Sequence, residues 1–379
     1  MNKIISFSKK LQDKNVLTLW LNNLFVVYAF LLPISQTIKA TVFTSMVVLF
    51  IIRGDIVKHI KFALSNQVVR AFFYFFLVYV IGLLWSDNTS EGLHWVKSVK
   101  YGLYLMLFYA IVDGRYINKV ISAFILGMLV SEFVSYSMML GLMPWKLELE
   151  GILFYQSYAI GDPSPFLHHI HYGVALAFTV ILLIRKTFFE ENSILLKVFM
   201  SIFIMTATMN IFITGGRTGY ITFLFLTIIL AITYLKKYAI FVFLAAGLTF
   251  TLAYSFSPIF NAKIHQTESS IVKLLNKDAN FSTSLGQRAG VYYYDYKIIK
   301  DNVLFGVGTG DSIDEFHKIL PQKWVSLKQM SHEHNQFLSV LVKLGIVGLM
   351  IYLNIFYQVF KYKQDEKDLR FIQVFVTLT

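Results

Sequence analysis

The 379-residue sequence carries 34 Lys and Arg side chains against 22 Asp and Glu side chains, a net charge of +12. Hydrophobic residues make up 56% of the chain and charged residues 15%, well below the roughly 25% of soluble domains. This composition excludes an ordinary soluble protein and indicates a protein embedded in membrane lipids. The absence of cysteine excludes disulfides and thiolate metal sites. Because the basic residues lie between hydrophobic segments, we attribute the positive charge to membrane topology and expect no nucleic-acid partner.

Apolar segments close to the length that crosses a bilayer recur along the chain. We expect spans at about 17–34, 37–52, 68–85, 99–113, 117–140, 171–185, 194–213, 218–235, 238–257 and 337–360. An eleventh apolar segment begins at Phe371 and stops at Thr379, so the last spans are expected to be incomplete. The predicted fold class is all-α, a polytopic transmembrane bundle of about 11–12 spans.

The distribution of Lys and Arg predicts the orientation, because basic residues concentrate in cytoplasmic loops. If the N-terminus is cytoplasmic, alternate loops hold most of them: Arg53, Lys58, Lys61 and Arg70; Arg115 and Lys119; Arg185 and Lys186; Lys236 and Lys237; Lys361, Lys363, Lys367 and Arg370. We therefore expect a cytoplasmic N-terminus.

Two outer loops are predicted to be long, at about 141–170 and 258–335. The second exceeds what a connection needs, and such loops are usually functional or disordered. Its many aromatic residues favour order, and Gln287 to Asn302 is expected to form a short helix. We expect one integral membrane domain over 1–379, in which 1–213 is mainly scaffold and 214–350, including loop 258–335, is the catalytic core.

Arg217 follows Gly215 and Gly216 at the expected outer start of a span. Exposed backbone N–H groups at a helix start, together with a guanidinium, suit a phosphate. The alternative is an interfacial arginine that reaches lipid headgroups. Arg288 is a second cation that could help to clamp a diphosphate, or it could simply be solvated.

His334 lies just before the last long span, next to Asn335 and two residues after His332. The helix dipole disfavours imidazolium there, which suits a general base. The alternative is an interfacial histidine bonded to headgroups or to Asn335. Glu333 could orient a histidine or be solvated, and we do not expect the two histidines to share a metal.

Three further histidines, His168, His169 and His171, precede Tyr172 and Gly173 at the sixth expected span. We favour interfacial structure or substrate contact for them over zinc, because no cysteine and no suitably spaced carboxylate accompanies them. The glycines Gly306, Gly308 and Gly310 are expected to shape a turn rather than to bind a nucleotide. Gly345 and Gly348, within the last long span, are expected to allow close helix packing.

Taken together, three segments resemble the O-antigen ligase family, which shares its core region with the O-antigen polymerases. They are Gly216–Tyr220, Arg288 followed by Asp301–Gly310, and His334-Asn335 through Leu338 to Gly345, Val347 and Gly348. The resemblance covers roughly residues 200–350.

This resemblance implies a bacterial inner-membrane glycosyltransferase with a large periplasmic loop between the ninth and tenth spans and a periplasmic active site. It implies inverting, metal-independent transfer of a glycan from undecaprenyl diphosphate to a hydroxyl of the lipid A–core oligosaccharide in lipopolysaccharide assembly. Arg217 and Arg288 would bind the diphosphate and His334 would deprotonate the acceptor, with His332, Asn335, His169 and Gly216 as accessory candidates. No cofactor and no metal is expected, and the partners would be the two substrates and membrane lipids.

Other acceptors and another class of protein stay open. The same donor site would serve an O-antigen polymerase or a protein O-oligosaccharyltransferase. A transporter of lipid-linked sugars is disfavoured, because it would be expected to show repeats, broken helices and ionisable groups at mid-membrane depth. The charged residues gather instead at expected helix ends and in the outer loop.

Overall fold

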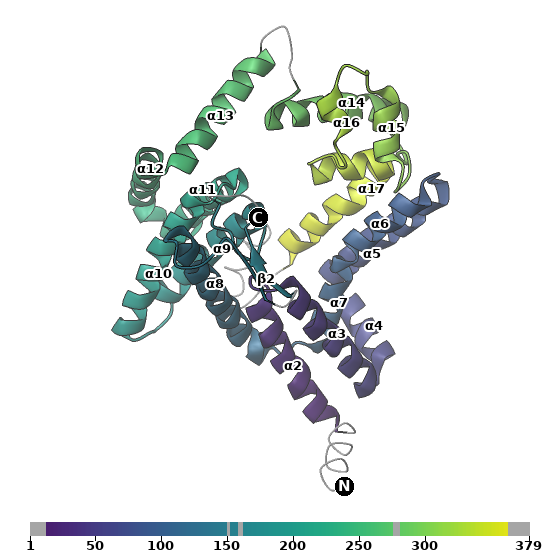
Figure 1. Cartoon of the computed structure of the whole chain (residues 1–379). Helices are drawn as coiled ribbons and strands as arrows, with labels where there is room; N and C mark the ends of the chain where they lie inside the picture. The colour runs from purple at the N-terminus through teal and green to yellow at the C-terminus, as the bar shows by residue number, and fades with distance from the viewer. Residues whose placement is uncertain (1–12, 150–151, 158–161, 276–280, 363–379) are drawn as a thin grey trace. The chain divides into compact units, whose positions relative to one another are not determined.

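The computed structural model describes residues 13–149, 152–157, 162–275 and 281–362, and helices dominate it (Figure 1). Within these residues, nine helical segments are long and apolar enough to cross a membrane. They contain α2 (Lys14–Leu31), α3 (Gln36–Arg53), α5 (Gln67–Ile81), α8 (Ile117–Met139), α9 (His169–Phe188), α10 (Ile194–Ile213), α11 (Arg217–Leu230), α12 (Ala239–Phe256) and α17 (Gln336–Lys361).

The expected span at 99–113 takes a different form in the structure. Helix α6 (Thr89–Val99) is followed at once by α7 (Tyr101–Ile111), and Lys100 between them keeps helical dihedral angles. Neither helix is long enough alone. Each helix has 11 residues and is therefore about 16 Å long at roughly 1.5 Å per residue, against a hydrocarbon core of about 30 Å. The eleventh expected span, from Phe371, lies outside the described residues, so the expected total is not reached within them.

By internal contacts the chain divides into two compact units. Unit 1 comprises residues 1–56, 111–264 and 365–379, and unit 2 comprises residues 57–110 and 265–364. Unit 1 contains α2, α3 and α8 to α12. Unit 2 contains α5 to α7 and α17, with four shorter or more polar helices: α4 (Ile56–Ser65), α14 (Ser284–Asp301), α15 (Ser312–Ile319) and α16 (Val325–Lys328). Helix α13 (Pro258–Leu275) contains the boundary between the units.

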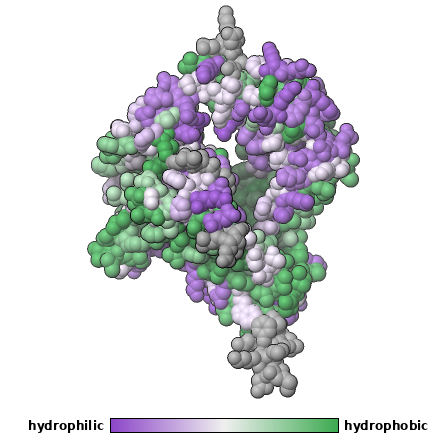
Figure 2. All heavy atoms as spheres, in the orientation of Figure 1, coloured by the Kyte–Doolittle hydropathy of each residue, from purple (hydrophilic) through white to green (hydrophobic). Residues whose placement is uncertain are grey.

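Hydrophobic side chains cover the outer faces of several long helices. On α10 the large apolar side chains of Ile194, Leu195 and Met205 are exposed, and α12 buries very little of its surface. Figure 2 shows hydrophobic residues over α10 and hydrophilic residues gathered over α14 to α16. Apolar surface this extensive is a liability in water. The chain is therefore a multi-pass membrane protein whose apolar helix faces meet lipid.

Helix α9 is the centre of unit 1 and packs against α10 and α11. Its side chains Tyr172, Leu176 and Ala177 are completely buried. It meets α11 at two glycines: a Cβ added to Gly219 would lie 2.8 Å from the Cα of Gly173. This close approach fixes the start of α11, where Arg217 lies.

Unit 1 also contains a small antiparallel sheet, which the all-α prediction did not include. Strand β1 (Lys146–Leu149) pairs with β2 (Ile152–Gln156) within the segment between α8 and α9. The alternation of polar and apolar residues in Lys146–Leu149 is typical of a half-buried strand. Tyr155 packs with Val134 and Met138 of α8, so the hairpin is held against the helices.

In unit 2 the last long helix, α17, packs along α5 and also contacts α14 and α15 (Figure 1). Val340 and Leu344 of α17 join the apolar cluster around Tyr79, and Val342 joins a second cluster around Val291. Tyr294, Phe316 and Trp324 belong to this second cluster, which fits the order expected from the aromatic residues of segment 258–335.

Helix α17 is broken at Gly345, where φ is 62° and ψ is −164°. The backbone of Val303–Gly308 fills the break. Val307 and Gly308 donate N–H groups to the carbonyls of Val342 and Lys343 (3.0 and 2.9 Å). Ile346 and Val347 donate in turn to the carbonyls of Val303 and Leu304 (2.9 and 3.3 Å).

The glycines on both sides of this junction are required by it. A Cβ on Gly345 would lie 2.3 Å from the carbonyl oxygen of Leu304, and one on Gly306 would lie 2.5 Å from the backbone nitrogen of Leu344. The expectation that Gly345 serves helix–helix packing was therefore wrong, because it accommodates a loop backbone. Gly306 and Gly308 have positive φ values, in line with the expected turn.

Candidate functional site

His334 lies in a short loop whose backbone is held on both sides. Its φ is 56°, a left-handed conformation that costs a non-glycine residue about 1–3 kcal/mol and persists only where the surroundings impose it. On the C-terminal side, the Asn335 side chain caps α17 by accepting the N–H groups of Phe337 and Leu338 (3.0 and 3.3 Å). The accessory candidate Asn335 therefore has a structural role, and His334 remains exposed beside the helix start.

On the N-terminal side, Glu333 is buried rather than solvated. Its side chain is 2% exposed, and its carboxylate accepts a 2.6 Å hydrogen bond from the ammonium of Lys343. Burial alone would raise the pKa of Glu333, but the nearby ammonium outweighs burial and holds that pKa below its ordinary value. Of the two alternatives for Glu333, the solvated one is thus wrong.

The two histidines of this loop lie together, with ring centroids 3.8 Å apart. Partial desolvation of the ring, followed by the charges of His332 and Arg288, lowers the pKa of His334 below its ordinary value of 6.5. His334 is therefore mainly neutral at pH 7 and has a lone pair available to accept a proton. The effect of Arg288 on the pKa also shows that this guanidinium lies near His334 within unit 2.

Arg288 is in the second turn of α14, a helix expected from the sequence and capped by Thr283. The guanidinium-bearing residue is half-buried. Helix α14 lies tightly on α16: a Cβ on Gly290 would be 2.8 Å from Leu327. The Trp324 indole donates to the hydroxyl of Tyr294 (3.1 Å), which adds a second link to this helix. These contacts hold α14, which carries Arg288, against α16 and the residue before it.

Arg217 begins α11 in unit 1, as the sequence predicted, with Gly216 as the capping residue. A Cβ on Gly216 would lie 2.6 Å from the carbonyl oxygen of His169, so only glycine lets the helix start approach α9 this closely. Arg217 itself is half-buried. The N-terminal backbone of α11 and a guanidinium thus occur together, the combination that favours an anion.

A buried carboxylate, Asp162, organises the residues around this helix start. It lies 3.2 Å from Nδ1 of His169 and accepts hydrogen bonds from Ser164 Oγ (2.9 Å) and from the backbone of Gly215. Burial would raise the pKa of Asp162, but the contact with His169 and then the hydrogen bonds from Ser164 and Gly215 outweigh burial and lower this pKa. His169, an accessory candidate, is therefore oriented by a carboxylate.

The histidines at the start of α9 lie close together. The rings of His168 and His169 are 4.0 Å apart, and those of His168 and His171 are 6.3 Å apart. Throughout the described ranges, no group of three or more His, Asp or Glu side chains has an arrangement that could hold a metal ion.

The proposed substrate-handling residues are shared between the two units. His334, Arg288 and His332 lie together in unit 2, whereas Arg217, Gly216 and His169 lie together in unit 1. That all three principal residues converge on one substrate stays a prediction.

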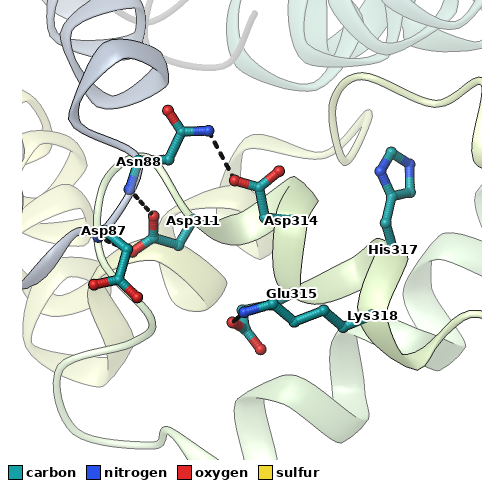
Figure 3. Close-up of a pocket in the computed structure, with 7 residues that line it drawn as sticks. All are labelled: Asp87, Asn88, Asp311, Asp314, Glu315, His317 and Lys318. Atoms are coloured by element: carbon teal, nitrogen blue, oxygen red, sulfur yellow. Dashed lines mark hydrogen bonds and ion pairs between the residues drawn. The ribbon is translucent and has the colours of Figure 1, made fainter.

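An open pocket of about 760 Å³ in unit 2 offers a different environment (Figure 3). Its lining comprises Asp87, Asn88, Asp311, Asp314, Glu315, His317 and Lys318. Asp311 accepts the backbone N–H groups of Asp87 and Asn88 (2.9 and 2.7 Å), and the Asn88 amide donates to Asp314 (2.8 Å). Its carboxylates, from Asp87, Asp311, Asp314 and Glu315, would repel a diphosphate. The hydrogen bonds of Asp311 and Asp314 link the start of α15 to the residues directly before α6.

Sequence reasoning missed the residues that hold the site. Lys343 is a single cation within an otherwise apolar stretch, and charged residues inside spans are rare and usually have a partner. That rule was a usable signal for Lys343. Asp162 and Asp295 gave no comparable signal, because their burial depends on contacts between segments distant in the sequence.

Comparison with known proteins locates the same region. Residues 200–353 match the family model described as O-antigen ligase, a segment shorter than half of the chain. No curated protein sequence matched the chain. The matched segment includes α11, α14 and the start of α17, and with them Arg217, Arg288 and His334. Over this region the chain is similar to the O-antigen ligase family.

Proposed function

We propose that the protein transfers a glycan from undecaprenyl diphosphate to a hydroxyl of the lipid A–core oligosaccharide. The family indicates a glycosyltransferase-like ligase or polymerase in general terms. The proposal adds the donor, the acceptor and the residues: His334 as the general base, with Arg217 and Arg288 on the diphosphate.

In this reaction the acceptor hydroxyl attacks the anomeric carbon on the face opposite the diphosphate, so the configuration inverts. The hydroxyl proton goes to the free nitrogen of His334 as the new carbon–oxygen bond forms. The bond between the anomeric carbon and the diphosphate oxygen breaks, and its electron pair leaves with undecaprenyl diphosphate. The two guanidinium groups stabilise the negative charge that develops on this leaving group, without a metal ion.

The observation that carries the proposal is the state of His334. It is exposed, its pKa is lowered, and Arg288 is close enough to contribute to that lowering. A neutral imidazole can accept the proton of the acceptor hydroxyl, and a neighbouring cation can stabilise an anionic leaving group. A positioned base contributes about 10²–10⁴-fold to the rate.

We place the active site on the periplasmic face of the inner membrane. The bias of Lys and Arg supports a cytoplasmic N-terminus, and this assignment takes α6 and α7 together as one crossing of the membrane. Segment 258–335 would then be periplasmic.

The test compares a strain lacking the gene with the same strain carrying the wild-type chain or His334→Ala. Without the gene, glycan should accumulate on undecaprenyl diphosphate while the lipid A–core stays bare. The wild-type chain should restore transfer, and His334→Ala should reach the membrane without restoring it. Arg217→Lys, which keeps a charge but loses the bidentate geometry, is the second informative variant.

Other outcomes would contradict this assignment. If glycan still reaches the core but its length collapses, the protein is a polymerase. If only glycosylated proteins disappear, the acceptor is a protein hydroxyl. If glycan stays on the cytoplasmic face, the protein is a transporter. Full transfer by His334→Ala would remove that residue from the mechanism.

A further inference from the structure

Lys343 is a cation enclosed within a membrane helix. It lies two turns after the start of α17, and its side chain is completely buried. The side chain extends back toward the helix start, where Nζ donates to Glu333 (2.6 Å) and to Ser339 Oγ (2.8 Å). The ammonium also lies 4.0 Å from the ring centroid of Trp95 on α6. The ion pair thus links α17 and α6 to the loop before α17.

A second carboxylate faces the same pair. Asp295 of α14 is 1% exposed, and its Oδ2 has no hydrogen-bond partner in the part of the chain that the structure describes. Burial, and then the charge of Glu333, raises the pKa of Asp295 to about 7, while Lys343 acts in the opposite direction. Glu91 of α6 also interacts electrostatically with Lys343. The ion pair is therefore surrounded by groups from three helices.

Stability alone does not explain such an arrangement. Replacing a buried ion pair by apolar side chains of similar size is often neutral or stabilising, because the desolvation cost disappears. What an ion pair adds is a defined geometry between its two elements. In this chain the two elements are the rigid start of α17 and the residue directly before His334.

The Glu333–Lys343 ion pair bears on the direction of the side chains in the loop before α17. With Glu333 directed inward to Lys343, its neighbours His332 and His334 are exposed and their rings lie together. The left-handed backbone of His334 lies between two anchors, the ion pair on one side and the Asn335 cap on the other. Loss of the first anchor leaves the loop free to relax to an unstrained backbone.

We propose that Glu333 and Lys343 are positioning residues that hold the His334 imidazole in its working orientation at the start of α17. This inference rests on the proposed function, in which His334 is the base. Neither residue takes part in proton transfer from the acceptor.

The test uses the full-length double variant Glu333→Met/Lys343→Met, which replaces both charges by side chains of similar length. Three quantities are measured in detergent: the melting temperature, amide hydrogen exchange at residues 331–338, and the rate of transfer from undecaprenyl-diphosphate-linked glycan to lipid A–core. The control is Glu315→Met/Lys318→Met, which removes the exposed ion pair of α15 in the same unit.

We expect the double variant to melt at or above the wild-type temperature and to exchange faster at residues 331–338. A misplacement of about 1 Å can cost on the order of 100-fold in rate. We therefore expect kcat to fall by about 10–100-fold while KM changes little, because the substrate-binding arginines are intact. The control should match the wild type in all three quantities.

Wild-type exchange and wild-type kcat in a stable double variant would overturn the proposal. If the double variant does not fold, Glu333→Asp replaces it: this variant keeps both charges but shortens the side chain, and an unchanged kcat would likewise overturn the proposal. His334→Ala in the same assay separates the two hypotheses. If His334→Ala is inactive while the double variant is fully active, the positioning role of Glu333 and Lys343 is wrong, but His334 is still supported as the base. If it is fully active, the proposed function fails.

Discussion

Each unit holds a buried carboxylate beside a residue of the proposed site, but the two carboxylates have different partners. In unit 2, Glu333 is paired with an ammonium enclosed in a membrane helix. In unit 1, Asp162 is held by an imidazole, a hydroxyl and a backbone N–H. An imidazole can be neutral at physiological pH, whereas an unpaired ammonium inside a membrane span has a high free-energy cost. The first arrangement depends on charge and the second mainly on hydrogen bonds.

The largest loss of stability is expected when one partner of the buried ion pair is removed and the other charge stays unpaired. Lys343→Met removes the partner of Glu333 and leaves a buried carboxylate uncompensated, which typically costs about 3–5 kcal/mol. We expect a strongly lowered melting temperature of the purified protein. Lys361→Met, at the exposed end of the same helix, is the matched control and should change stability by less than about 0.5 kcal/mol. Equal melting temperatures would show that the ion pair does not hold unit 2 together.

The second prediction concerns how the stability of the protein depends on pH through the buried carboxyl of Asp295 in unit 2. The pKa of Asp295 is about 7 in the folded protein and 3.8 as its ordinary value. Between these values the folded state binds a proton that the unfolded state has released, so stability falls as pH rises through this window. At about 1.36 kcal/mol per pKa unit, the loss is at most about 4 kcal/mol.

Asp295→Asn should remove this slope and raise the melting temperature at pH 8 relative to the wild type. The exposed Asp301→Asn, on the same helix, is the control. A wild-type protein whose stability does not fall between pH 4 and 8 would contradict the assignment.

The third prediction separates backbone strain from a steric clash by means of two glycines, one in each unit. Gly54 and Gly345 have nearly the same backbone angles, with φ of 75° and 62° and ψ of −167° and −164°. A Cβ on Gly54 meets nothing within 4 Å, whereas one on Gly345 lies 2.3 Å from the Leu304 carbonyl oxygen. Gly54→Ala should therefore cost only the strain of a positive φ, about 1–3 kcal/mol. Gly345→Ala should cost clearly more in the same thermal unfolding measurement, and equal costs would contradict the clash.

The smallest effect is expected from Asp162→Asn in unit 1. The amide keeps one oxygen acceptor and replaces the other by an N–H2 group, so either Ser164 Oγ, which donates to Oδ1, or His169 Nδ1, which lies against Oδ2, loses its acceptor, at a cost of about 1 kcal/mol. Asp162→Ala, which removes the acceptor altogether, should destabilise more. If the Asn variant is as unstable as the Ala variant, the charge of Asp162 matters as much as that of Glu333.

Sequence patterns predicted the membrane helices well, because a protein that folds in water rarely contains so many apolar runs long enough to cross a bilayer. They did not predict how α6 and α7 join, since Glu91, Lys97 and Lys100 interrupt the apolar run. The break at Gly345 was missed for another reason. It depends on hydrogen bonds from Val303–Gly308, and no local pattern reveals a partner about forty residues away.

In the candidate site, too, local sequence predicted some features, and contacts between distant residues were missed. Arg217 at a helix start and His334 beside a span were found from local sequence, and the structure has them there. The grouping of Arg288 with His334 came from the family resemblance, and their joint role at one substrate stays a prediction. The burial of Glu333 by Lys343 is a tertiary contact ten residues apart, across a loop and two helical turns.

The loop that enters the break in α17 has a consequence for biosynthesis. Residues 303–308 leave the ribosome before α17, yet their backbone supplies hydrogen bonds that α17 lacks at Gly345. In lipid, unsatisfied backbone groups cost several kcal/mol each, so this helix cannot be completed in the bilayer before the earlier segment has docked. We therefore expect docking of the loop to accompany insertion of α17.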